Sequence, residues 1–144
     1  MRMTWLLAAG LYVAALPFAY AQAQQEREAR PYPPPPGSNE VLRSMLAGTP
    51  GVEVIVSDVV IPPNGQVARH YHPGEEFLYL IEGTAIHVEE GKPDLPLAAG
   101  DSYAIPPRAI HAPRGGPEGA RAIVFRVHLA GQPERIDAPL EPAS

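Results

Sequence analysis

Four residues in the middle of the chain are of types that bind transition metals. His70 and His72 are separated by a single residue, Glu76 follows the turn at Pro73-Gly74, and His111 lies on a later segment. Residues i and i+2 of a strand point to the same face, so His70 and His72 can bind one ion together. Three neutral imidazoles and one carboxylate suit a single divalent ion of Mn, Fe, Ni, Cu or Zn, and they leave one or two positions open. All must be deprotonated to bind, so metal affinity should fall at acid pH.

From the residues alone, surface histidines on unrelated strands are the competing interpretation. The spacing, however, resembles the two signature motifs of the cupin superfamily. The first reads G-x4-H-x-H-x3-E-x6-G and the second G-x5-P-x4-H, and they are carried here by Gly65, His70, His72, Glu76 and Gly83, and by Gly100, Pro106 and His111. The resemblance covers about residues 41–129 and is that of a small, single-domain, type-2-like cupin. It implies a jelly-roll β-barrel, a metal bound inside it by His70, His72, Glu76 and His111, and frequently a homodimer.

The chain departs from the family pattern at a few positions. The first glycine-to-histidine gap is one residue shorter than usual, Arg108 replaces a common glycine, and Gly115 replaces a frequent asparagine. None of these changes removes a ligand. Arg108 lies near the expected mouth of the site, where it could pair with an anionic group of a substrate or simply be solvated.

Short β-branched runs, separated by turns rich in Gly and Pro, predict a β-sandwich or barrel. Strands are expected over residues 52–56, 59–61, 76–82, 84–89, 95–98, 102–105 and 120–129, with a short alternating segment over 66–72 and with 41–46 ambiguous between a strand and a helical turn.

The alternation of apolar residues predicts which side chains face inward. On the last strand these are Ile123, Phe125, Val127 and Leu129, which leaves Arg126 and His128 on the other face. Because Ile86 and Val88 are expected inside, His87 should face outward, and neither His87 nor His128 is an expected ligand. Leu78 and Leu80 share the parity of Glu76, so they and Phe125 are expected to line an apolar cavity.

Composition limits the classes of protein. The chain has 144 residues, of which 19 are Pro and 13 Gly, with no Cys and a net charge of −5. That length allows one domain, and the Pro and Gly content argues against a helical bundle. The lack of Cys excludes disulfides and thiol chemistry, and no basic stripe supports nucleic-acid binding.

The first 21 residues have the layout of a secretory signal peptide: Arg2 near the start, an apolar stretch, and small residues at Ala19, Ala21 and Ala23. Cleavage is expected after residue 21 or 23, with export to the periplasm or beyond and no stable membrane insertion; an uncleaved anchor is the alternative. Residues 22–40 are expected to be a Pro-rich disordered linker, 41–130 the barrel, and 131–144 a Pro-rich tail.

An open-sided metal in an apolar barrel favours chemistry on a small oxygenated organic molecule. The preferred interpretation is that the protein is a metal-dependent oxidoreductase resembling a dioxygenase. An isomerase, a decarboxylase and a non-catalytic module that holds a metal or small ligand remain open, so whether the protein is an enzyme is left undecided here, and no catalytic residue is assigned.

Overall fold

The computed structural model describes residues 32–138 and contains only β-strands over that range. Its elements are β1 (Gly37–Met45), β2 (Val52–Ile61), β3 (His70–Tyr71), β4 (Glu75–His87), β5 (Leu95–Ala98), β6 (Ser102–Ile105), β7 (Arg114–Leu129) and β8 (Ile136–Asp137). The expected signal peptide and both cleavage sites lie outside the described residues. Within the described range, no helix is long and apolar enough to cross a membrane.

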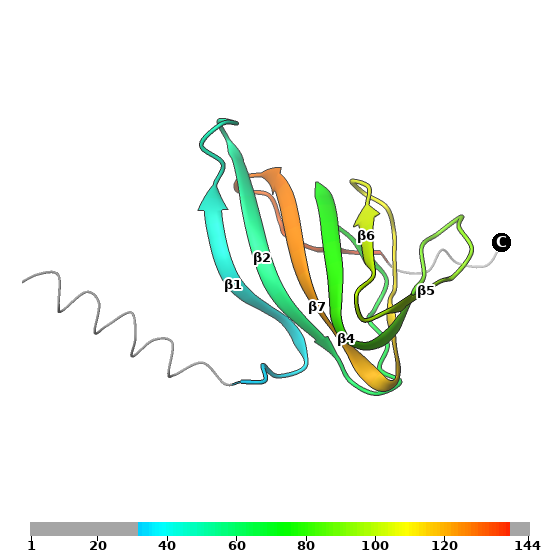
Figure 1. The fold of residues 1–144 in the computed structure, drawn as a ribbon. Coiled ribbons are helices and arrows are strands. Elements are labelled where there is room, and N and C mark those ends of the chain that lie inside the picture. The colour runs from blue at the N-terminus through cyan, green and yellow to red at the C-terminus, as the bar shows by residue number, and fades with distance from the viewer. Residues whose placement is uncertain (1–31, 139–144) are drawn as a thin grey trace, which may run out of the picture. The chain divides into compact units, whose positions relative to one another are not determined.

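The strands form two antiparallel layers. The main sheet has the order β1-β2-β7-β4-β5, with β6 also paired to β4, and a small sheet contains β3 and β8. Figure 1 shows β1, β2, β7 and β4 as one strongly curved sheet. Isolated bridges connect His111 to His70 and to Glu89, and Gln66 to Arg114. This is the all-β jelly roll that the sequence predicts.

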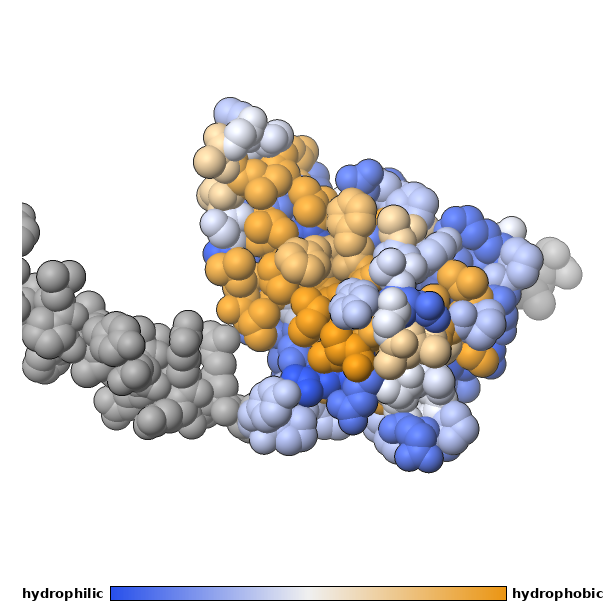
Figure 2. Space-filling model, in the orientation of Figure 1, coloured by the Kyte–Doolittle hydropathy of each residue, from blue (hydrophilic) through white to orange (hydrophobic). Residues whose placement is uncertain are grey.

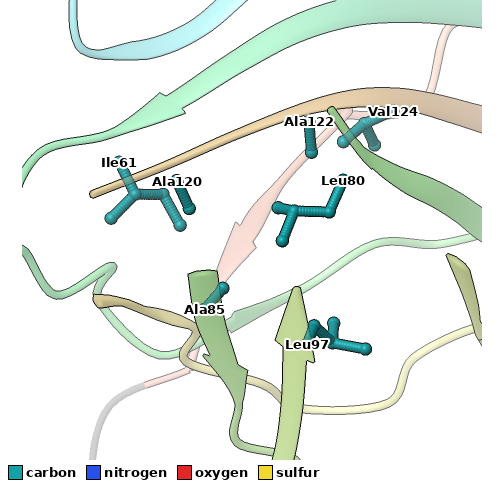
Figure 3. Close-up of a cluster of buried hydrophobic side chains, with 7 residues drawn as sticks. All are labelled: Ile61, Leu80, Ala85, Leu97, Ala120, Ala122 and Val124. Carbon is teal, nitrogen blue, oxygen red and sulfur yellow. The ribbon is translucent and has the colours of Figure 1, made fainter. Parts of the chain in front are cut away.

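The apolar core lies on the inner face of the main sheet. Its buried members come from β2, β4, β5 and β7, and they converge in Figure 3: Ile61, Leu80, Ala85, Leu97, Ala120, Ala122 and Val124. Three of these seven are alanines, whose short side chains fill little of the space between the layers. The core therefore leaves room for an internal cavity.

The facing of β7 is the reverse of the prediction. Val124, Arg126 and His128 are buried, whereas Phe125 is 43% exposed and Leu129 is 55% exposed. The prediction took the more apolar face of the strand as the inner one. That was wrong because the inner face carries polar site residues and small alanines, while large apolar side chains lie outside.

The facing of His87 was also predicted wrongly. Residues 76–82 and 84–89 were expected as separate strands, but β4 continues through Gly83, which has a φ of 75°. The pairing of β4 with β7 shifts register on both sides of Gly83. A shift of one residue exchanges the two faces of a strand, so His87 points inward and is only 3% exposed.

The folded region extends beyond both predicted boundaries. β1 begins at Gly37, four residues before the expected start at Val41, and pairs with β2 throughout. At the other end, part of the Pro-rich tail forms β8, which pairs with β3, and Ala138 is buried. Neither short segment is apolar enough to be recognised as a strand before its partner is known.

The outer face of the main sheet carries exposed apolar side chains. They include Phe77, Tyr79 and Ile81 on β4 and Phe125 and Leu129 on β7, each at least 38% exposed. Figure 2 shows hydrophobic side chains gathered over the strands of the main sheet. The homodimer inferred from family resemblance stays a prediction.

Candidate metal centre and cavity

Three of the four predicted ligands come together because two segments pair through their backbones. His70 and His111 exchange both hydrogen bonds across an antiparallel bridge, with N···O distances of 3.0 and 2.9 Å. His72 follows His70 on the same face of the chain. One ring nitrogen of each of the three histidines lies within 4.8 Å of the others, and all three side chains are buried. The structure therefore contains a His70-His72-His111 cluster that could hold a metal ion.

Each imidazole is oriented by a backbone carbonyl. Nδ1 of His70 is 2.8 Å from the oxygen of Ala68, and Nδ1 of His111 is 2.9 Å from that of Ala109. Nδ1 of His72 pairs in the same way with the carbonyl of Glu134. A carbonyl only accepts, so Nδ1 carries the proton and Nε2 of each neutral ring keeps its lone pair. This is the arrangement by which proteins orient metal-binding histidines.

Glu76 projects from β4 toward the same cluster. Its Oε2 is 3.1 Å from Nε2 of His72, and its Oε1 is 4.0 Å from Nε2 of His111. Glu75, the preceding residue, is exposed on the opposite face of the strand.

Arg126 is a site residue that the sequence analysis placed on the wrong face. Its Nε donates to Oε2 of Glu76 at 2.7 Å. Its Nη1 lies 2.7 Å from Oε1 of Glu134 and 3.2 Å from Oγ of Ser57. Glu134, in the C-terminal segment, therefore holds Arg126 with its side chain and His72 with its backbone.

Burial dominates the electrostatics of the histidines. Desolvation, together with the neighbouring charge of His111, lowers the pKa of His70 to about 3. Desolvation also lowers the pKa of His72 and His111, although Glu76 opposes the shift at both residues. The three rings are therefore neutral, as metal binding requires, at physiological pH.

The pKa of Glu76 is lowered as well. Burial alone would raise it, but the effects of Arg126, His72 and His111 together outweigh burial, and the positive charge of Arg126 is the largest of them. Three neutral nitrogen ligands and one ionised oxygen ligand fit a first-row divalent ion. Nε2 of His72 is buried and has no hydrogen-bond donor among the described residues, because Oε2 of Glu76, 3.1 Å away, is also an acceptor. This unsatisfied atom is a further sign that the cluster is built to bind something.

Two histidines of the cluster, His70 and His111, lie with Glu76 on the wall of a cavity of about 180 Å³. Most of the lining is apolar and includes Leu78 and Leu80, as predicted, but not Phe125, which is exposed on the outer face. The polar part of the lining comprises Ser38, His70, Glu76, His87, His111, Arg126 and Arg135. A cavity of roughly 150 Å³ can hold a benzene molecule, so this one suits a ligand with a single small ring.

Arg108 keeps the turn that a glycine would make. Its φ is 63°, its N–H donates to the carbonyl of His72 at 2.8 Å, and its guanidinium lies 5.3 Å from the centre of the Tyr71 ring. It is exposed and does not line the cavity. The cations at the cavity wall are instead Arg126, on β7, and Arg135, in the C-terminal segment.

Comparison with known proteins agrees with this geometry. Residues 57–126 match the family model described as a cupin domain. Just under half of the chain is therefore similar to a cupin domain. Two curated relatives, both 3-hydroxyanthranilate 3,4-dioxygenases of Xanthomonas oryzae pv. oryzae, are 30% identical to it over 74 residues, or 49% of this chain. The match spans only 42% of the relatives' own length.

Solved structures show the same fold. A cupin-like protein from Thermotoga maritima is 25% identical, with a TM-score of 0.55, over 70% of this chain and 74% of its own. An uncharacterised conserved protein with a double-stranded β-helix domain from Klebsiella pneumoniae is 24% identical, with a TM-score of 0.55, over 80% of this chain and 94% of its own. The second likeness concerns the fold alone.

Proposed function

We propose that this cupin domain binds one divalent transition metal through His70, His72, Glu76 and His111 and acts as an oxidoreductase on a small oxygenated organic molecule. The observation that carries the proposal is the cluster of three oriented imidazoles, of which His70 and His111 line a mostly apolar cavity. The dioxygenase relatives support the class of reaction, over the half of this chain that they match. A bound metal would supply a Lewis acid and a site for an oxygen-containing ligand.

The residues of the chain have separate parts in this proposal. The backbone carbonyls of Ala68, Ala109 and Glu134 fix the rings, so that Nε2 of each points toward the site. Arg126 keeps Glu76 ionised and in place, which favours a role as ligand over one as a proton acceptor. The apolar walls exclude water and bind the body of the molecule.

The volume of the cavity narrows the substrates to test. About 180 Å³ accommodates a single ring, so one-ring catechols and short 1,3-diketones fit better than three-ring flavonols. Protein purified without oxygen should contain close to one equivalent of metal by elemental analysis. Oxygen uptake with one of these compounds, lost in His111→Ala, is the expected result. Metal and ligand binding without turnover would point to a non-catalytic binding module, and turnover without oxygen uptake to an isomerase or decarboxylase.

We also propose that the chain is exported, on the basis of the signal-like first 21 residues. N-terminal sequencing of protein from the periplasm or medium should begin at Gln22 or Gln24. Retention of Met1 in a membrane fraction after an alkaline wash would contradict cleavage.

A further inference from the structure

His87 is a polar residue of the cavity wall that has no part in the proposed metal site. It is 3% exposed, lines the cavity beside His111, and its ring centre lies 5.6 Å from that of His111. Its Nδ1 is buried and has no hydrogen-bond partner among the described residues. Buried polar atoms are rarely left unpaired, because the loss of hydration costs free energy.

The other ring nitrogen of His87 is committed to Glu89. Nε2 lies 3.2 Å from Oε2 of Glu89, which is itself buried. Burial would raise the pKa of Glu89, but hydrogen bonds from Lys92, His87 and Tyr103 outweigh it and the pKa is lowered. An ionised carboxylate only accepts, so Nε2 carries the ring proton and is the donor, which leaves the lone pair of Nδ1 free to accept.

Two further contacts hold Glu89 in position. The hydroxyl of Tyr103 donates to Oε2 of Glu89 at 3.1 Å, and Nζ of Lys92 lies 2.7 Å from Oε1. The Tyr103 ring also packs on the ring of His87, with 4.8 Å between the two centres. The orientation of His87 is therefore fixed before any ligand arrives, so it is suited to selecting a ligand.

Among the described polar side chains of the cavity wall, His87 is the one with a buried ring nitrogen that has neither a hydrogen-bond partner nor a place in the metal cluster. The Nε2 atoms of His70 and His111 belong to the metal cluster, Glu76 is paired with Arg126, and the two arginines only donate. The hydroxyl of Ser38 already accepts from Nη1 of Arg126 at 3.3 Å. From this we infer that His87 Nδ1 accepts a hydrogen bond from a hydroxyl or N–H group of the bound molecule and so selects ligands that carry such a donor beside their metal-binding oxygens. Glu89, Tyr103 and Lys92 are positioning residues. This inference rests on the proposed function, because the ligand is held at the same site.

The test measures ligand binding rather than turnover. The cleaved full chain is loaded with zinc, which has no redox chemistry, and is titrated without oxygen by calorimetry. The probes are pyrogallol and 3-methoxycatechol, which share the catechol pair of oxygens but differ in whether the third oxygen carries a hydrogen. Pyrogallol should bind about tenfold more tightly, as expected for one hydrogen bond in a buried site.

Three variants locate the source of this preference. In His87→Gln the amide can still donate to Glu89, but the acceptor at Nδ1 is lost. The two probes should therefore bind with about equal affinity, and the zinc content should be unchanged. In His87→Asn an amide oxygen lies near the position of Nδ1, so part of the preference should remain. Glu75→Gln, on the exposed face of the same strand, should retain all of it.

A measurement on the unaltered protein does not depend on whether the variants fold. The ¹⁵N resonance of His87 Nδ1 should move upfield with pyrogallol and remain in place with 3-methoxycatechol. An equal preference in the unaltered protein and His87→Gln, or the loss of zinc from His87→Gln, would overturn the inference while leaving the proposed function intact. If neither probe binds to the zinc-loaded protein, the proposed function and the inference both fail.

Discussion

Nε of Arg126 donates a hydrogen bond to Oε2 of Glu76 at 2.7 Å, and both side chains are almost fully buried. The pair connects the main sheet, where both residues lie, to the histidines of the second layer. The contact with Arg126 explains how the buried carboxylate of Glu76 can remain ionised inside the barrel. The energetic consequence is that neither partner can be removed alone without leaving a buried charge.

Replacing Arg126 with Met in the metal-free protein should lower the free energy of unfolding by about 3–5 kcal/mol, because the charge of Glu76 is left unpaired. Urea denaturation in the presence of a chelator measures the change. Adding Glu76→Gln to the same chain should recover much of the loss. As a control, Arg114→Met removes the exposed ion pair with Asp94 and should cost no more than about 1 kcal/mol. A loss of similar size from both single variants would show that the buried pair is not special.

The second prediction concerns which histidines hold the metal. His72→Ala and His111→Ala should each lose the ion on dialysis, and the thermal stabilisation produced by added metal should disappear with it. His87→Ala should retain the ion, because His87 lies outside the cluster of three. Elemental analysis of matched preparations gives the answer. Metal retained by His111→Ala and lost from His87→Ala would show that the ligands are assigned wrongly.

The histidine cluster could be predicted because its spacing carries geometric information. The i, i+2 spacing of His70 and His72 fixes a common face wherever the strand lies, and the later His111 needs only one antiparallel bridge to reach them. A β-sandwich or barrel was equally predictable from short strands and frequent turns, and the resemblance to cupins narrowed this to a jelly roll. The same resemblance placed Glu76 among the ligands, and so on the inner face.

The facing of Phe125 and His87 could not be predicted, for two different physical reasons. On β7 the inner face is built from Arg126 and alanines, so the more apolar set points outward. On β4 the register shift near Gly83 exchanges inside and outside, and a shift of this kind depends on the partner strand. The roles of Arg126 and Glu134 follow from long-range pairing that no local pattern reveals.

The C-terminal segment gives the third prediction. Truncation after Pro133 removes β8 and the Glu134 carbonyl that orients His72, so metal affinity should fall about 10–100-fold. Truncation after Ala138 preserves both features and should leave the affinity unchanged. Glu134→Ala keeps the carbonyl but removes the ion pair with Arg126, and should have an intermediate effect. Competition with a chromophoric chelator measures the affinities. Equal affinities for the two truncated chains would show that the segment does not support the site.

The final prediction is the pH dependence of the metal-free protein. His70 titrates near its usual pKa of 6.5 when unfolded, but at about 3 in the folded state. Between these values the unfolded chain binds more protons, so stability is greatest above about pH 6.5 and falls as the pH is lowered. His72 and His111 shift in the same direction and add to the effect. Glu76, whose pKa is lowered from 4.5, contributes mainly below that value, so a change in stability between about pH 5 and pH 7 reports on the histidines.

The urea midpoint, measured with a chelator, should therefore drop between about pH 7 and pH 5 and drop less in His70→Gln. A midpoint that stays constant or rises on acidification would mean that the three rings are not buried as neutral groups.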